Sequence, residues 1–252
     1  MFDMAQAQQL ANKAKRKLKR NPEFYEGMPA VTFEVVGYYD RPKENKVLHF
    51  LGEGAWTVAF MDDDENVFLF TDEQSSWADN SKAFVAGFNE KHGSLKHIPQ
   101  VESYGSFDNS NGDFENMNDW AGLELYISPL YDVPLDPDKQ NHKKPFAMYY
   151  WLRNAIKDAK RTHTHEEWGG DTTKIRTHVR KLAERDKSKV PPALTQEEWG
   201  EFIENLILFI SESIDFSPTL NMEIRRDNVG VDENGDLILL DIFYDQVGMD
   251  NI

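Results

Sequence analysis

Short apolar runs separated by turn-forming clusters dominate the first half of the chain. Such runs, rich in β-branched and aromatic residues and bounded by Pro, Gly, Asn and Asp, are typical of β-strands. Six strands are predicted, over residues 31–36, 46–51, 57–60, 67–71, 100–105 and 123–127. Between them, residues 77–92 place Phe84, Val85 and Phe88 at helical spacing, which predicts one helix. The first half is therefore expected to be a sheet that carries a helix.

The second half has the periodicity of helices. Apolar residues at helical spacing predict helices over 146–160 and 172–186, and a third that follows Thr195. Thr195 and Glu198 form the sequence pattern of a capping box, in which each side chain satisfies a backbone amide of the first turn. The apolar stripe that follows is interpreted as core packing. After this helix, two short apolar strands flank Asn234-Gly235, the dipeptide that favours a type I′ hairpin turn.

These elements predict an α+β protein in three parts. Residues 1–30 are expected to form a helical arm, because residues 3–20 contain strong helix formers but few apolar positions. Residues 31–130 are expected to form a β-rich part, and residues 131–252 a helical part that ends in the hairpin.

Charge separates the arm from the rest of the chain. The formal net charge is −16, yet residues 1–20 hold six basic residues and one acidic residue, so they carry +5 and the remainder carries −21. A body this acidic repels nucleic acids and anionic membranes, and is attracted to basic proteins. Direct nucleic-acid binding is therefore expected only through the basic arm at residues 13–20. The alternative is an acidic surface that only keeps the protein soluble.

Two absences narrow the class further. The longest uninterrupted apolar run, residues 206–210, is too short to span a bilayer, and no apolar segment of a secretory signal follows the basic N-terminus. The chain contains no cysteine, which excludes disulfides and zinc–thiolate sites. These features favour a cytoplasmic protein that does not bind membranes.

Candidate chemistry lies in the closing hairpin. Asn228 follows Glu223 by five residues, and Asp241 follows Asn228 by thirteen. At these spacings the segment resembles the catalytic loop and metal-binding segment of protein kinases, in which an asparagine and an aspartate hold Mg²⁺ at the phosphates of ATP. The other reading is an ordinary surface hairpin with solvated Asp and Asn side chains.

A second segment is similar to another kinase motif. Gly52 and Gly54, followed by Trp56, resemble the glycine-rich loop whose backbone amides approach nucleotide phosphates. The two motifs occur in kinase order, and with the reduced helical part the chain most resembles the small early serine/threonine kinases of T7-type bacteriophages. The resemblance implies a two-lobed protein-kinase-like fold that uses ATP and Mg²⁺ in the cytoplasm of the host cell. Gly52, Gly54, Asn228 and Asp241 would contact the nucleotide, and Asn228 and Asp241 would hold the metal.

The chain also departs from the kinase pattern. Leu69 stands about where the phosphate-binding lysine belongs, Glu223 replaces the catalytic aspartate, and Asn221 replaces the histidine before it. Arg225 stands where a basic residue neutralises the transferred phosphoryl group, although a salt bridge with local acids would explain it equally well.

Three functions therefore stay open. The first is a pseudokinase or strongly impaired kinase that acts by binding a host protein complex with a basic surface, in host takeover or counter-defence. The second is an active, divergent serine/threonine kinase in which Glu223 is the base and Arg225 assists. The third is an acidic inhibitor that mimics nucleic acid and binds a basic host enzyme.

Overall fold

The computed structural model describes residues 30–37, 44–53, 57–72, 80–107, 123–163 and 172–245. Its chain divides into two compact units, one made of residues 1–79 and 101–130 and the other of residues 80–100 and 131–252. Residues 80–100, which the sequence analysis grouped with the β-rich part, belong to the second unit. The expected N-terminal arm, apart from residue 30, lies outside the described residues.

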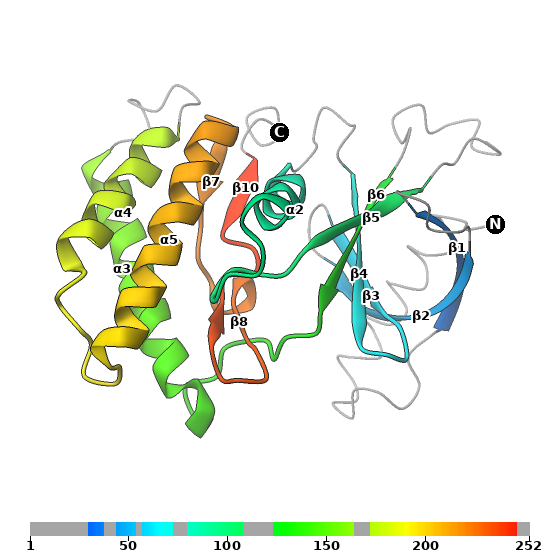
Figure 1. The fold of residues 1–252 in the computed structure, drawn as a ribbon, viewed down its shortest axis with the longest axis horizontal. Helices are drawn as coiled ribbons and strands as arrows, with labels where there is room; N and C mark the ends of the chain where they lie inside the picture. The colour runs from blue at the N-terminus through cyan, green and yellow to red at the C-terminus, as the bar shows by residue number, and fades with distance from the viewer. Residues whose placement is uncertain are drawn as a thin grey trace. The chain divides into compact units, whose positions relative to one another are not determined.

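The first unit is a closed antiparallel barrel (Figure 1). Its six strands are β1 (Ala30–Gly37), β2 (Glu44–Glu53), β3 (Thr57–Met61), β4 (Asn66–Asp72), β5 (Glu102–Phe107) and β6 (Leu123–Pro129). The strand order is β1-β2-β3-β4-β6-β5, and β1 closes the barrel by pairing with β5. Leu48, Phe60, Phe68 and Leu125 are among the buried apolar residues of this unit.

All six predicted strands are present. Their limits shift by one to a few residues, and closure into a barrel was not expected from the sequence. Closure removes free sheet edges, because each strand then has two hydrogen-bonded neighbours.

Four helices belong to the second unit: α2 (Ser81–His92), α3 (Lys143–Thr162), α4 (Thr173–Asp186) and α5 (Gln196–Phe216). In Figure 1, α3, α4 and α5 lie side by side, and α2 lies next to α5. The capping box is confirmed: the Thr195 hydroxyl accepts a hydrogen bond from the Glu198 amide at 3.2 Å, and the Glu198 carboxylate accepts one from the Thr195 amide at 2.8 Å. The α+β class is thus confirmed.

Two short strand pairs follow α5 and complete the second unit. Strand β7 (Leu220–Met222) pairs with β10 (Phe243–Asp245), and β8 (Gly230–Val231) pairs with β9 (Leu237–Ile238). Between β7 and β8 the chain makes the single 3-10 turn η3 (Arg226–Asn228), while a similar turn, η1 (Gln140–His142), precedes α3. Within the described part of the chain, no helix is long and apolar enough to cross a membrane.

The turn between β8 and β9 is not of type I′, so that prediction was wrong. A type I′ turn needs a positive φ at both central residues, but of Asn234 and Gly235 only Gly235, at 81°, has one. The physical reason is the Asp232 side chain, whose carboxylate accepts hydrogen bonds from the amides of Asn234 at 3.0 Å and Asp236 at 2.8 Å. These bonds stabilise a longer connection between the two strands.

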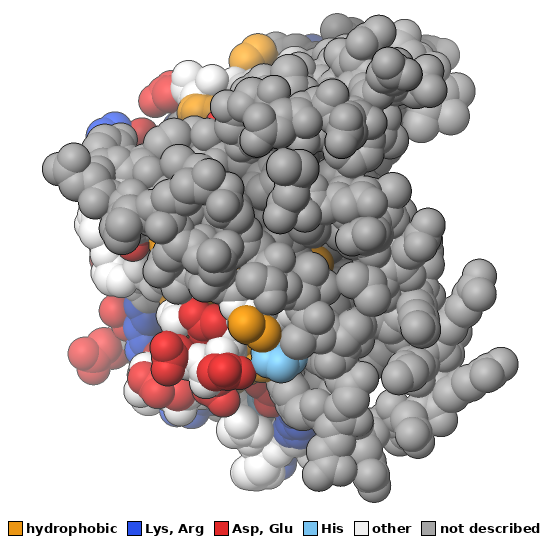
Figure 2. Space-filling view, turned by 90° about the vertical axis from the view of Figure 1, so that its right-hand side faces the viewer, with side chains coloured by type: hydrophobic (Ala, Val, Ile, Leu, Met, Phe, Trp, Pro, Cys, Tyr) orange, Lys and Arg blue, Asp and Glu red, His pale blue; other side chains and the backbone are white. Residues whose placement is uncertain are grey.

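Acidic side chains gather beside a histidine on the described part of one face (Figure 2). The β3–β4 turn has this composition: Asp63, Asp64 and Glu65 are exposed, and the His49 ring lies 3.1 Å from the Asp63 carboxylate. Part of the negative charge of the chain therefore lies on the exposed β3–β4 turn of the barrel.

Candidate functional site

Asn228 and Asp241, the two predicted metal ligands, are held against each other in the second unit. The Asn228 side-chain amide donates a hydrogen bond to the Asp241 backbone carbonyl at 2.8 Å. In return, the Asp241 backbone amide donates to the Asn228 carbonyl at 3.0 Å. Asn228 is buried at 8% exposure, whereas the Asp241 side chain is 52% exposed. The hairpin thus presents a half-exposed carboxylate beside a fixed amide.

Lys82 completes this group, and the sequence analysis did not identify it. Its ammonium donates a hydrogen bond to the Asp241 carboxylate at 3.0 Å, while the Lys82 side chain is only 10% exposed. The ion pair joins the first turn of α2 to a segment 159 residues later in the chain. We call Lys82, Asn228 and Asp241 the Lys82 cluster.

Helix α2 is fixed in place by aromatic packing beneath the Lys82 cluster. The Phe84 ring lies 5.1 Å from the Phe209 ring of α5 and 5.5 Å from the Phe243 ring of β10, centroid to centroid. Phe88 packs edge-on against Phe209 at 5.0 Å. Such aromatic contacts contribute stabilisation beyond that of the apolar area that they bury. The position of the Lys82 ammonium therefore depends on the packing of the whole helix.

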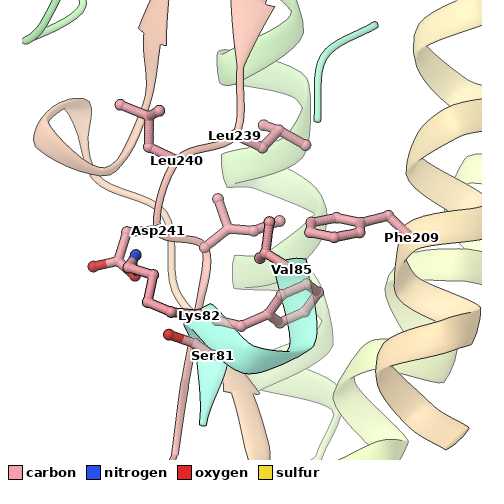
Figure 3. Close-up of a pocket in the computed structure, with 9 residues that line it drawn as sticks. Ser81, Lys82, Val85, Phe209, Leu239, Leu240 and Asp241 are labelled. Carbon is pink, nitrogen blue, oxygen red and sulfur yellow. The ribbon is translucent and has the colours of Figure 1, made fainter. Parts of the chain in front are cut away.

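A narrow crevice runs from these apolar side chains to the ion pair (Figure 3). It is tightly packed and leaves no space for a water molecule. Val85 and Phe209 lie on its apolar side, and Lys82 points toward the Asp241 carboxylate at the opposite side. The charged pair thus lies where an apolar lining meets polar groups.

Glu223, the predicted catalytic base, lies on the segment between β7 and η3. Its backbone amide donates to the carbonyl of Ile242 at 3.0 Å, which places it beside the residue that follows Asp241. Burial raises the pKa of Tyr244, and the negative charge of Glu223 adds to that shift. Burial lowers the pKa of Lys160, a shift that Glu223 opposes. Glu223 therefore has a cation from α3 and a phenol from β10 in its surroundings.

The remaining predicted residues are placed differently. Arg225 is exposed, and its guanidinium lies 3.5 Å from the Asp227 carboxylate, the local salt bridge that the sequence analysis gave as the alternative. Gly52 lies in β2 of the first unit, opposite Ala59 and next to an irregularity of the strand register. Gly54 lies outside the described residues. Leu69 lies in β4, where it pairs with Ala59 and Tyr126.

The Lys82 cluster contains oxygen donors of the kind that Mg²⁺ prefers. Mg²⁺ prefers oxygen ligands, and the Asp241 carboxylate and the Asn228 side-chain oxygen are of this kind. No group of three or more His, Cys, Asp or Glu side chains able to hold a metal occurs among the described residues. A Mg²⁺ ion at this place would take its other ligands from water and phosphate, as is usual for Mg²⁺ at nucleotide sites.

Lys82 and Lys160 were not predicted as site residues, although the sequence around each of them indicates that it lies on a buried helical face. Lys82 precedes the buried Val85 by three residues, so it shares the helical face of Val85. Lys160 follows the buried Ile156 by four residues in the same way. A lysine that continues an apolar helical stripe has its ammonium near the interior, and such a group needs an anionic partner.

Comparisons with known proteins do not assign this chain to a family. No protein-family model matches the chain, and no curated protein matches it. A solved structure, the GDP and kanamycin complex of the aminoglycoside phosphotransferase APH(2")-IIia, is similar over 90% of this chain and 73% of that chain, at 14% sequence identity and a TM-score of 0.32. So distant a likeness supports neither a fold nor a function by itself.

Proposed function

We propose that this chain is a protein-kinase-like protein whose second unit binds the phosphates of ATP with Mg²⁺, and whose phosphoryl transfer is absent or strongly impaired. The observation that carries the proposal is the Asn228–Asp241 pair, joined by two hydrogen bonds at the spacing of the kinase metal ligands. Bound Mg²⁺ would neutralise phosphate charge, while Asn228 and Asp241 would orient it.

Impaired transfer is expected from the residue at the position of the catalytic base. Glu223 is one methylene longer than the aspartate that kinases use as a base, and a misplacement of about 1 Å can cost about a hundredfold in rate. Since phosphoryl transfer depends on positioned charges, a site with a displaced base is expected to bind better than it catalyses.

A protein that binds but does not transfer would act through its surface. The net charge of −16 and the exposed acidic β3–β4 turn favour a partner with a basic face. Together with the resemblance to phage kinases, this supports binding to a host protein complex in the host cytoplasm. Mimicry of nucleic acid toward a basic host enzyme would use the same charge, and in either case binding should weaken at high salt.

One observation favours an active serine/threonine kinase as the second candidate. Glu223 keeps a carboxylate on the segment that is hydrogen-bonded to Ile242, directly after Asp241. In an active enzyme Glu223 would accept the proton of the substrate hydroxyl. Lys160 would then be better placed by its burial than the exposed Arg225 to compensate negative charge near that carboxylate.

Thermal unfolding with and without ATP and Mg²⁺ tests the proposal. A ligand that binds only the native state stabilises it by about 2.7 kcal/mol at about 100 times its Kd. We expect this stabilisation in the wild type and its loss in Asp241→Asn. Asp227→Asn is the matched control, because Asp227 is an exposed residue of the same loop and should leave the stabilisation unchanged.

The absence of any stabilisation by ATP and Mg²⁺ in the wild type would refute nucleotide binding. Transfer is measured separately, with ATP labelled in its γ-phosphate and serine-containing protein substrates. Transfer that Glu223→Gln abolishes would establish the active kinase instead of the impaired one.

A further inference from the structure

Lys82 lies in a place that the stability of its own helix does not explain. It is the second residue of α2, and the N-terminal end of a helix carries partial positive charge that disfavours a cation. The first turn of α2 contains no acidic residue to offset this effect. Lys82 as a whole is also only 8% exposed, and lysines are rarely so buried unless they are paired. Its position therefore depends on an anionic group outside the helix.

Asp241 meets only part of that requirement. Its side chain is 52% exposed, so the carboxylate faces solvent as well as Lys82. An ammonium has three N–H donors, and one of them bonds Asp241. Lys82 can thus keep this bond and donate to another anion that binds beside the same carboxylate.

The proposed function defines what this anion would be. The resemblance to kinases requires a cation at the nucleotide phosphates, and Leu69 in β4 cannot supply one. Lys82 lies 3.0 Å from the carboxylate expected to hold Mg²⁺, so a phosphate bound to that Mg²⁺ would come close to the ammonium. The aromatic packing of Phe84 and Phe88 on Phe209 holds α2 against α5, with the Lys82 ammonium beside Asp241.

We propose that Lys82 is the phosphate-binding cation of this site, carried by helix α2 instead of by a strand of the barrel. The inference rests on the proposed function and extends it, since it assigns the charge that the kinase motif lacks. Because Lys82, Asn228 and Asp241 all belong to the second unit, phosphate recognition uses groups whose positions relative to one another are set within that unit.

Equilibrium binding of ATP with Mg²⁺ to three lysine variants tests this inference. Lys82→Met should weaken binding at least about tenfold, the scale of one lost hydrogen bond to a charged group. Lys82→Arg should recover most of the affinity because it keeps a cation. Lys91→Met is the matched control: Lys91 lies on the same helix but pairs with Glu212 in solvent, and its loss should change binding by less than about twofold.

A chemical probe keeps the test valid if Lys82→Met fails to fold. An acyl phosphate of ATP transfers its acyl group to a lysine amine near the bound phosphates: the amine attacks the acyl carbon, an amide forms, and ATP leaves. Mass spectrometry of the labelled wild type should find the acyl group on Lys82, and excess ATP with Mg²⁺ should suppress it. Labelling of Lys160 or another lysine in place of Lys82 would overturn the inference.

The possible failures can be told apart. If the wild type binds ATP with Mg²⁺ and Asp241→Asn does not, while Lys82→Met binds like the wild type, Lys82 is only a structural partner of Asp241 and this inference alone is wrong. If the wild type does not bind, the proposed function is wrong and the inference falls with it.

Discussion

Helices α5 and α2 are both apolar on one side, but they are stabilised in different ways. Helix α5 begins at a capping box, has Glu197 and Glu198 in its first turn, and buries Trp199 completely. Helix α2 has no side-chain hydrogen bond at its N-cap and no acidic residue in its first turn. Its buried rings instead contact rings of α5 and β10. Neighbouring residues in the sequence set where α5 begins, whereas residues far away in the sequence set the position of α2.

The geometry of the candidate site depends on α2, the helix whose position is set by tertiary contacts. The capping box fixes the start of α5 through neighbouring residues, so a substitution there is expected to leave α2 in place. A helix that is positioned by tertiary contacts transmits any change of those contacts to the groups that it carries. Since Lys82 is carried by α2, the Lys82 cluster should respond to the packing of α2 more than to the capping of α5.

The strongest test of this comparison is Phe84→Ala. Phe84 is 3% exposed and contacts four aromatic rings, so its truncation should lower the free energy of unfolding by about 3–5 kcal/mol, the usual cost of a buried Phe. The stabilisation by ATP with Mg²⁺ should also disappear, because Lys82 loses its fixed position. Chemical denaturation with and without nucleotide measures both effects.

Phe216→Ala is the control for Phe84→Ala. Its ring also contacts Phe84, at 5.4 Å, but the residue is 48% exposed, so the loss should stay below about 1 kcal/mol. If both variants lost the same amount, or if Phe84→Ala retained nucleotide binding, α2 would not be the element that positions the site.

A smaller effect is expected at the start of α5. The hydrogen bond from Lys144 and that from the Thr195 amide lower the pKa of Glu198 from 4.5 to about 2. A lowered carboxyl pKa means that the stabilisation is complete above pH 4.5 and is lost as the pH falls from 4.5 toward 2. Glu198→Gln should therefore cost less than about 1 kcal/mol at neutral pH, and its difference from the wild type should vanish in acid.

Glu197→Gln controls for the removal of a charge in the same helical turn. Nucleotide-dependent stabilisation at neutral pH should be unchanged in both variants, and its loss in Glu198→Gln would contradict the separation between α5 capping and the Lys82 cluster.

The smallest effect is expected for the charged contact between the two helices. Lys91 of α2 lies 2.7 Å from the Glu212 carboxylate of α5, but its side chain is 61% exposed. Exposed ion pairs of this kind contribute about 0–1 kcal/mol and weaken with salt. Lys91→Met should therefore change the free energy of unfolding by no more than about 0.5 kcal/mol, measured at low and high salt. A loss as large as that of Phe84→Ala would mean that charge, not aromatic packing, holds α2.

Local patterns explain most of what could be predicted about the fold. The strand runs, the helices at residues 143–162 and 173–186, and the Thr195 capping box all depend on neighbouring residues, and all were found from the sequence. Closure of the barrel was not found, because the pairing of β1 with β5 joins segments about 70 residues apart. The turn type was wrong because the Asp232 carboxylate, not the Asn234-Gly235 dipeptide alone, determines the turn.

The predictions for the candidate site divide in the same way, between local spacing and contacts with distant segments. Asn228 and Asp241 could be predicted to lie together because kinase spacing along one hairpin is a local property, and the structure brings them together. Lys82 was not found because its contact with Asp241 depends on α2 docking against α5 and β10. Its position on the buried face of the predicted helix was visible, but the sequence does not say which distant carboxylate that face would meet.

The sequence separation of Lys82 and Asp241 also has a consequence for the order of folding. Contacts between residues 159 positions apart carry a large loop-closure entropy and tend to form after local structure. The β8–β9 hairpin and the isolated turns of α5 can form early, whereas α2 can dock only when both α5 and β10 are in place. Completion of the Lys82 cluster should thus be among the last steps, and a partly folded chain would retain helices and hairpins while lacking the lysine–aspartate contact.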